Sequence, residues 1–112
     1  MPHNQERFVS FLKKELGVFL QRHFPHDPGI FLSVLNVEVS ASAEEAKAYV
    51  SVFPENRADE VQKELKAARG QARHYLANRM RRRRRIPKIL FIPTNIEHEM
   101  RLEKLLEKVK NT

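Results

Sequence analysis

The spacing of hydrophobic residues predicts an amphipathic helix near the start of the chain. From Phe8 to Leu20, apolar side chains recur at steps of three and four residues, which places them on one face of a helix. Asn4 precedes this stretch as a suitable N-cap, and "FPHDPG" follows it with proline and glycine residues that do not continue a helix. We therefore expect a helix over about residues 5–23.

The next two hydrophobic segments alternate with a period of two, which is typical of half-buried strands. In "FLSVLNVEVS", the residues Leu35, Val37 and Val39 fall on one face. In "AKAYVSVF", the alternating apolar residues extend from Ala46 to Val52. The short polar segment "ASAEE" connects the two, so the pattern predicts an antiparallel hairpin.

From Arg57 onward the spacing is again that of a helix. Apolar residues recur at steps of three and four as far as Met80, with Gly70 in the middle. Glycine weakens a helix interior by about 1 kcal/mol relative to alanine, so Gly70 is either simply tolerated or marks a kink at "AARGQA". We expect a kink.

The end of the chain predicts a third strand and a final helix. "IPKILFIP" is a short apolar run between prolines, with Ile89 and Phe91 on one face of a strand, and Asn95 is placed to cap a helix after it. The predicted order is α-β-β-α(kinked)-β-α, that of a single two-layer α+β domain over residues 1–112 with a three-stranded sheet packed against helices. Six residues are expected to be nearly buried: Leu16, Val37, Val50, Leu65, Leu76 and Phe91.

Composition narrows the class of protein. The chain has 112 residues and no cysteine, which excludes disulfide bonds, a thiolate nucleophile and cysteine-ligated zinc. Its apolar runs are too short to span a membrane, and its first residues mix charges with apolar side chains, unlike the core of a signal peptide. We expect a cytoplasmic monomer.

The net charge of +7 is concentrated in one part of the chain. Residues 57–96 carry twelve basic and three acidic side chains, whereas residues 1–56 carry five basic and seven acidic ones. The segment "RMRRRRRIPK" at residues 79–88 alone has six arginines within seven positions. This concentration is typical of a protein with a polyanionic partner.

A helical projection of residues 57–85 places basic side chains beside the smallest residues. One face contains Lys63, Lys66, Gly70, Arg73, Ala77, Arg81 and Arg84. Such a face lets a phosphate backbone come close to the helix. Arg79 and Arg83 fall instead within the apolar stripe, where a small core does not bury an unpaired charge, so the helix is expected to end near Met80.

In their order and spacing these segments resemble a known family, bacterial ribosome-binding factor A. The resemblance rests on "DPGIFLSVLNVEVSASAEEAKAYVSVF", "LKAARGQARHYLANRM", "RRIPKILF" and "RLEKLLEKV", which cover nearly the whole chain. That family has a KH-like fold of type II topology, in which an Ala-x-Gly kink replaces the usual Gly-x-x-Gly loop. Ala68-Arg69-Gly70 stands in that place here.

The resemblance implies a non-enzymatic assembly factor that has no cofactor or metal. Such a factor would bind the immature small ribosomal subunit and its precursor ribosomal RNA, and would assist rRNA processing and maturation, notably in the cold. With the basic face, it makes the following the candidate RNA-binding residues: Lys63, Lys66, Ala68, Arg69, Gly70, Arg73, Arg79, Arg81, Arg82, Arg83, Arg84, Arg85 and Lys88.

Other chemistry has less support in the sequence. His23 and His26 lack a second cluster of metal ligands, no serine lies in a glycine-rich elbow, and no phosphate-cradling loop is present. Two alternatives stay open: a KH-like RNA or single-stranded nucleic-acid module without a ribosomal role, and a polybasic module for anionic lipid or protein. Six phenylalanines are expected in the core rather than as base-stacking platforms: Phe8, Phe11, Phe19, Phe31, Phe53 and Phe91.

Overall fold

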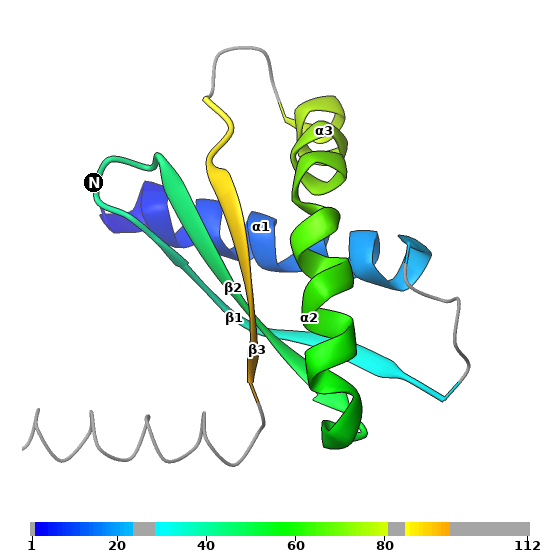
Figure 1. The fold of residues 1–112 in the computed structure, drawn as a ribbon. Coiled ribbons are helices and arrows are strands. Elements are labelled where there is room, and N and C mark those ends of the chain that lie inside the picture. The colour runs from blue at the N-terminus through cyan, green and yellow to red at the C-terminus, as the bar shows by residue number, and fades with distance from the viewer. Residues whose placement is uncertain (1, 24–28, 81–84, 95–112) are drawn as a thin grey trace, which may run out of the picture.

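The computed structural model describes residues 2–23, 29–80 and 85–94 (Figure 1). Its elements are, in chain order, α1 (Pro2–His23), β1 (Phe31–Val39), β2 (Glu45–Phe53), the short 3-10 helix η1 (Glu55–Arg57), α2 (Ala58–Ala67), α3 (Arg69–Arg79) and β3 (Lys88–Thr94). The first helix is confirmed and begins a few residues earlier than expected, at Pro2. The final helix predicted after Asn95 lies outside the described residues.

The three strands form one sheet in the order β1-β2-β3. β1 and β2 are antiparallel, with Val37 opposite Ala48, which confirms the predicted hairpin. β3 runs parallel to β2, with Phe91 opposite the same Ala48. The chain therefore crosses from β2 to β3 through α2 and α3, and this crossover brings the basic part of the sequence to one side of the sheet.

β1 departs from the expected alternation at a β-bulge. The register shifts between Val34 and Asn36, which leaves Leu35 as an extra residue in the strand. Val34 lies opposite the buried Val50 and packs against the core. The expectation that Leu35 shares the core face of β1 with Val37 is therefore wrong, because a strictly alternating pattern does not anticipate an inserted residue.

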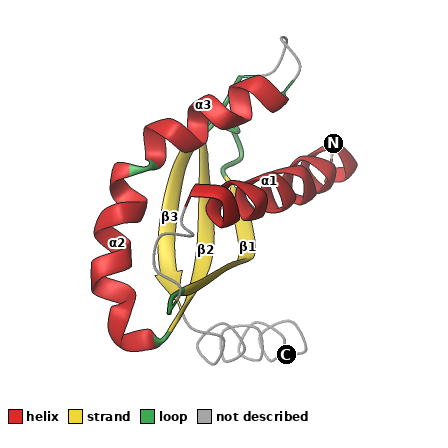
Figure 2. Ribbon diagram, turned by 90° about the vertical axis from the view of Figure 1, so that its right-hand side faces the viewer, coloured by secondary structure: helices red, strands yellow, loops and turns green. Residues whose placement is uncertain are grey.

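The core lies between the helices and one face of the sheet. Figure 2 shows α1 in front of the sheet, with α2 and α3 along the side formed by β3. Every second residue of β2 from Ala46 to Val52 is buried, as the alternation predicts. All six residues expected to be nearly buried are so, with Leu16, Val50, Leu65 and Leu76 at 0% exposure, Val37 at 3% and Phe91 at 5%.

Two of the phenylalanines expected in the core are instead on the surface. Phe31 at the start of β1 and Phe53 at the end of β2 are each 64% exposed. They are cross-strand partners on the sheet face opposite to the core, with ring centroids 6.4 Å apart. The prediction was wrong for this pair because Phe53 is an odd position of β2, whose even positions point inward, and Phe31 lies before the bulge in β1, where Leu32 and Val34 face the core. Phe8, Phe19 and Phe91 are buried as predicted.

Candidate RNA-binding surface

A bend at Ala68 divides the long predicted helix into α2 and α3 (Figure 2). Ala68 has φ −86° and ψ −2°, so the backbone leaves regular helical geometry for one residue. The bend remains hydrogen-bonded, because the Ala68 N–H donates to the carbonyl oxygens of Glu64 at 3.0 Å and Leu65 at 3.2 Å. The Ala68 side chain is only 7% exposed and joins the core. The predicted kink is confirmed, two residues before Gly70.

Gly70 lies in the first turn of α3, on the exposed side. Its φ is not positive, so the backbone there does not require glycine. A β-carbon added at Gly70 would meet nothing within 4 Å. What glycine provides at this position is therefore an uncovered stretch of helix backbone beside the bend.

The structure brings most of the candidate residues to the outside of α2, α3 and the start of β3. The exposed ones are Lys63, Lys66, Gly70, Arg73, Arg79, Arg85 and Lys88. Arg69 is half-buried at the bend, and its Nε atom is buried with no hydrogen-bond partner among the described residues. The side chain of Ala68 faces inward, so its contribution is the bend itself. The other four candidates, Arg81, Arg82, Arg83 and Arg84, lie outside the described residues.

Residues Arg81 to Arg84 are called the arginine run below, and the segment that follows them is fixed to the fold by polar contacts. Arg73 on α3 donates from Nη2 to the carbonyl oxygen of Ile86 at 3.2 Å. The Lys88 N–H donates to the carbonyl oxygen of Glu44, in the hairpin turn, at 2.8 Å. The Glu44 carboxylate also lies 3.7 Å from Arg85, although both side chains are mostly exposed and the pair is weak. The hairpin turn therefore lies beside Arg85 and Lys88, the residues that follow the run.

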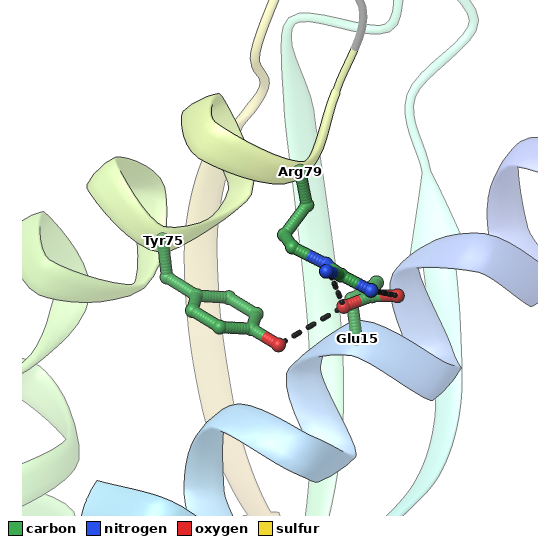
Figure 3. Close-up of polar contacts among 3 residues, drawn as sticks. All are labelled: Glu15, Tyr75 and Arg79. Atoms are coloured by element: carbon green, nitrogen blue, oxygen red, sulfur yellow. Dashed lines mark hydrogen bonds and ion pairs between the residues drawn. The ribbon is translucent and has the colours of Figure 1, made fainter.

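The segment that precedes the run is fixed by a buried carboxylate on α1 (Figure 3). Among the described residues, Glu15 is the charged one that the fold buries, at 5% exposure. Its Oε2 accepts hydrogen bonds from the Tyr75 hydroxyl at 3.0 Å and from Arg79 Nε at 3.1 Å. Its Oε1 accepts from Arg79 Nη2 at 3.4 Å. We call Glu15, Tyr75 and Arg79 the α1–α3 clamp.

The clamp shifts the pKa values of its three members. The hydrogen bond from Arg79 lowers the pKa of Glu15 below its ordinary value of 4.5, against the opposing effect of burial, and Tyr75 and Lys14 add to the lowering. Burial, and then the bond to Glu15, raises the pKa of Tyr75. The same bond raises the pKa of Arg79. Near neutral pH the clamp is thus a carboxylate held by a cation and a neutral phenol.

The sequence places the chain in a family as well. Residues 4–106 match the sequence profile of the family described as ribosome-binding factor A. The chain belongs to this family. A ribosome-binding factor A from Chlorobium luteolum is 34% identical over 113 residues, which cover 98% of this chain and 94% of that protein. Another from Halothermothrix orenii is 37% identical over 93% of this chain and 86% of its own length.

Solved structures of ribosome-binding factor A have the same fold as this chain. The crystal structure of the Thermus thermophilus protein superposes with a TM-score of 0.67 at 28% identity, over 79% of this chain and 92% of that one. A second set of coordinates is a homology model of the Thermus thermophilus factor fitted into a cryo-electron-microscopy map of its 30S complex. It superposes with a TM-score of 0.63 at 30% identity, over 75% of this chain and 88% of that one. The KH-like expectation of three strands packed against helices is confirmed.

Sequence reasoning missed two members of the clamp, Glu15 and Tyr75. A signal for them was present, because Glu15 falls within the apolar stripe of the first helix between Leu12 and Phe19. Arg79 falls within the apolar stripe of the later helix, so both helices have a charge on the apolar face, and these two charges are opposite. Pairing them predicts that the two helices meet at these residues, as they do.

The described residues hold little else that suggests chemistry. A shallow hollow of about 520 Å³ lies between α1 and β1, lined by Lys13, Gly17 and Leu32 among others. Within residues 2–23, 29–80 and 85–94, no group of three histidine or acidic side chains is placed to hold a metal ion. In the same part of the chain, no helix is long and apolar enough to cross a membrane.

Proposed function

We propose that this chain binds the small ribosomal subunit during its maturation and contacts ribosomal RNA through the basic side of α2, α3 and the arginine run. The observation that carries the proposal is its membership of the ribosome-binding factor A family, one of whose members has been fitted into a map of a 30S complex. The bend at Ala68 and the exposed basic residues around it support the choice of surface. The activity is binding, which assists rRNA processing by occupying the subunit.

The chemistry of the surface suits a phosphate backbone. Lys63 and Lys66 on α2 and Arg73 on α3 are exposed cations on either side of the bend, and Gly70 leaves the backbone between them uncovered. Arginine in the run offers a planar fork of donors that matches phosphate and can stack on an unpaired base. Phosphate contacts supply affinity and orientation but little choice of sequence. Selectivity for the subunit therefore comes from how the fold orients the arginines.

Arg79 contributes in two ways. Its Nε and Nη2 atoms are bonded to Glu15, so part of the guanidinium belongs to the fold. The side chain is nevertheless 57% exposed, and a guanidinium has five N–H donors, which leaves donors for a phosphate. Arg79 thus links the folded core to the run that begins two residues later.

The test is co-sedimentation of the purified protein with small ribosomal subunits at low salt. We expect the wild type to travel with the subunits, and a variant with Arg81 to Arg84 changed to glutamine to remain largely in the unbound fraction. The matched control changes to glutamine four exposed basic residues that are not among the candidate RNA-binding residues, namely Arg7, Lys13, Arg22 and Lys47. It alters the net charge equally and is expected to bind like the wild type. Equal loss of binding in both variants would show that binding depends on the net charge of the protein and not on this surface.

Two further experiments distinguish a ribosomal role from that of a general nucleic-acid-binding module. A KH-like nucleic-acid module without a ribosomal role binds free single-stranded RNA as tightly as it binds subunits, whereas we expect a clear preference for subunits. We also expect immature subunits, taken from cells that lack the protein, to bind more tightly than mature ones. Accumulation of unprocessed small-subunit rRNA in those cells, strongest in the cold, would support the maturation role. Normal rRNA processing at every growth temperature would contradict it.

A further inference from the structure

We propose that Glu15 is a positioning residue for RNA binding, which fixes the point where the arginine run leaves α3 by holding Arg79. This inference deepens the proposed function and rests on it. Glu15 itself lies on α1, is buried, and carries a charge opposite to that of a phosphate-binding group. It therefore acts on RNA through the residues that it holds.

The geometry places the clamp at the exit of the helix. Arg79 is the last residue of α3, and Met80 is already extended, with φ −95° and ψ 150°. The Met80 N–H donates to the carbonyl oxygen of Leu76 at 2.8 Å, which closes the final turn. The direction in which the chain continues is thus set at Arg79 and Met80. Because two donors of Arg79 are fixed on a carboxylate of another helix, this direction is tied to α1.

The residues that follow the run are held by contacts that do not involve Glu15. Pro87 is buried, Arg73 donates to the Ile86 carbonyl, and the Lys88 N–H donates to the Glu44 carbonyl. The described residues on both sides of the run are therefore held, Arg79 and Met80 at the end of α3, and Ile86 and Lys88 at the start of β3. Releasing Arg79 from Glu15 leaves the other contacts in place, so the expected consequence is a change in the direction in which Arg79 and Met80 lead the chain, and not loss of the domain.

A carboxylate at this position makes little sense as an electrostatic aid to RNA binding. Replacing Glu15 by glutamine removes a negative charge near a surface that attracts an anion. If Glu15 were a bystander, electrostatics alone would make the variant bind subunits more tightly. If Glu15 positions the run, the variant binds less tightly despite its higher positive charge. The two views therefore predict changes in the affinity of Glu15→Gln that have opposite signs.

The experiment measures the affinity of Glu15→Gln for small ribosomal subunits as a function of salt. Loss of one phosphate contact of about five lowers the affinity about three- to tenfold and changes the log–log salt slope from about −3.5 to about −2.8. Glu6→Gln, an exposed residue of the same helix, makes the same change in net charge and is the matched control. It is expected to bind like the wild type or slightly more tightly.

A double-mutant cycle distinguishes positioning from a general loss of structure. In the background with Arg81 to Arg84 changed to glutamine, Glu15→Gln is expected to have no further effect on affinity, because the groups that it positions are gone. An equal loss in both backgrounds would overturn the inference, as would tighter binding by Glu15→Gln alone. Failure of the wild type to bind subunits would instead overturn the proposed function, so the two failures are distinguishable.

Tyr75→Phe serves if Glu15→Gln folds poorly. It keeps the ring that packs 5.6 Å from Phe19, centroid to centroid, and removes only the hydroxyl donor to Glu15. A smaller loss of affinity than for Glu15→Gln is expected.

The distance between the two helices can be measured directly, because the chain has no cysteine. Spin labels at Lys13→Cys on α1 and Asn78→Cys on α3 report this distance. A broader distance distribution in the clamp variant is expected, and an unchanged one contradicts the inference.

Discussion

Glycine at position 70 leaves the helix without a side chain there, and its backbone angles are ordinary. The bend is made at Ala68 with angles open to any residue, and Gly70 follows it in ordinary helical geometry. The glycine therefore has a cost in helix propensity that the bend does not explain. Close approach of a ligand backbone is the remaining use that glycine serves at an exposed position.

Replacing Gly70 by alanine should separate stability from binding. No atom within 4 Å opposes the added methyl group, so we expect the free energy of unfolding to rise by up to about 1 kcal/mol. Affinity for small subunits should fall, because the methyl group covers the exposed backbone. Gly17→Ala on α1 is the matched control, since its β-carbon also meets nothing within 4 Å, and it should add stability without loss of binding. Equal binding by both variants would make Gly70 a tolerated residue.

Glu15 should give the protein a sensitivity to acid. Its pKa is lowered in the folded state, chiefly by Arg79, so the carboxylate stabilises the fold fully above the unfolded pKa, about 4.3 to 4.5. This contribution is lost as the pH falls through the lower, folded pKa. Urea unfolding at pH 7, 5 and 3.5 should therefore show a smaller drop in stability for Glu15→Gln than for the wild type. Tyr75→Phe, which removes one donor to the carboxylate, should respond between the two.

At the scale of elements, periodicity predicted most of the fold because burial of one face dominates each element. The stripes of α1, β2 and β3 were correctly predicted, and the kink was expected within two residues of its position. The bulge at Leu35 was not, since an extra residue is fixed by pairing with β2 and leaves no trace in a single strand. Phe31 and Phe53 are exposed although they are strongly hydrophobic, because their positions in β1 and β2 point away from the core.

The exposure of Phe31 and Phe53 has a measurable consequence. Phe31 and Phe53 pair on the outer face of the sheet, so Phe31→Ala should lower the free energy of unfolding by at most about 1 kcal/mol. Leu76→Ala, which truncates a side chain with no exposure in α3, should cost about 2 to 5 kcal/mol. Denaturant titration of both variants tests the assignment. Similar losses would place Phe31 in the core after all.

At the scale of the whole molecule, the fold converts a charge run into an oriented surface. The sequence alone located the excess of basic residues, because composition is local. It did not reveal how the residues on either side of the run are held, because each contact joins residues far apart in the chain, such as Glu15 with Arg79 and Glu44 with Lys88. The opposite charges of Glu15 and Arg79, each on the apolar face of its helix, are the feature of the sequence that indicates the clamp.

This arrangement predicts how binding responds to salt. If the surface engages about five phosphates of a single-stranded site, the logarithm of the association constant should fall with the logarithm of salt concentration at a slope near −3.5. Changing Arg81 to Arg84 to glutamine should flatten the slope, towards about −0.7 if all four arginines contact phosphate. The fold should remain intact, because exposed arginines contribute little to stability.

The matched control distinguishes a specific surface from overall charge. The variant with Arg7, Lys13, Arg22 and Lys47 changed to glutamine has the same net charge as the arginine-run variant. Counterion release counts only the phosphates that are contacted, so the control should keep the wild-type slope. An unchanged slope in the arginine-run variant would show that the run is not the main phosphate-binding element. In that case, the contacts would have to lie elsewhere, and the hairpin beside the run would be the next surface to test.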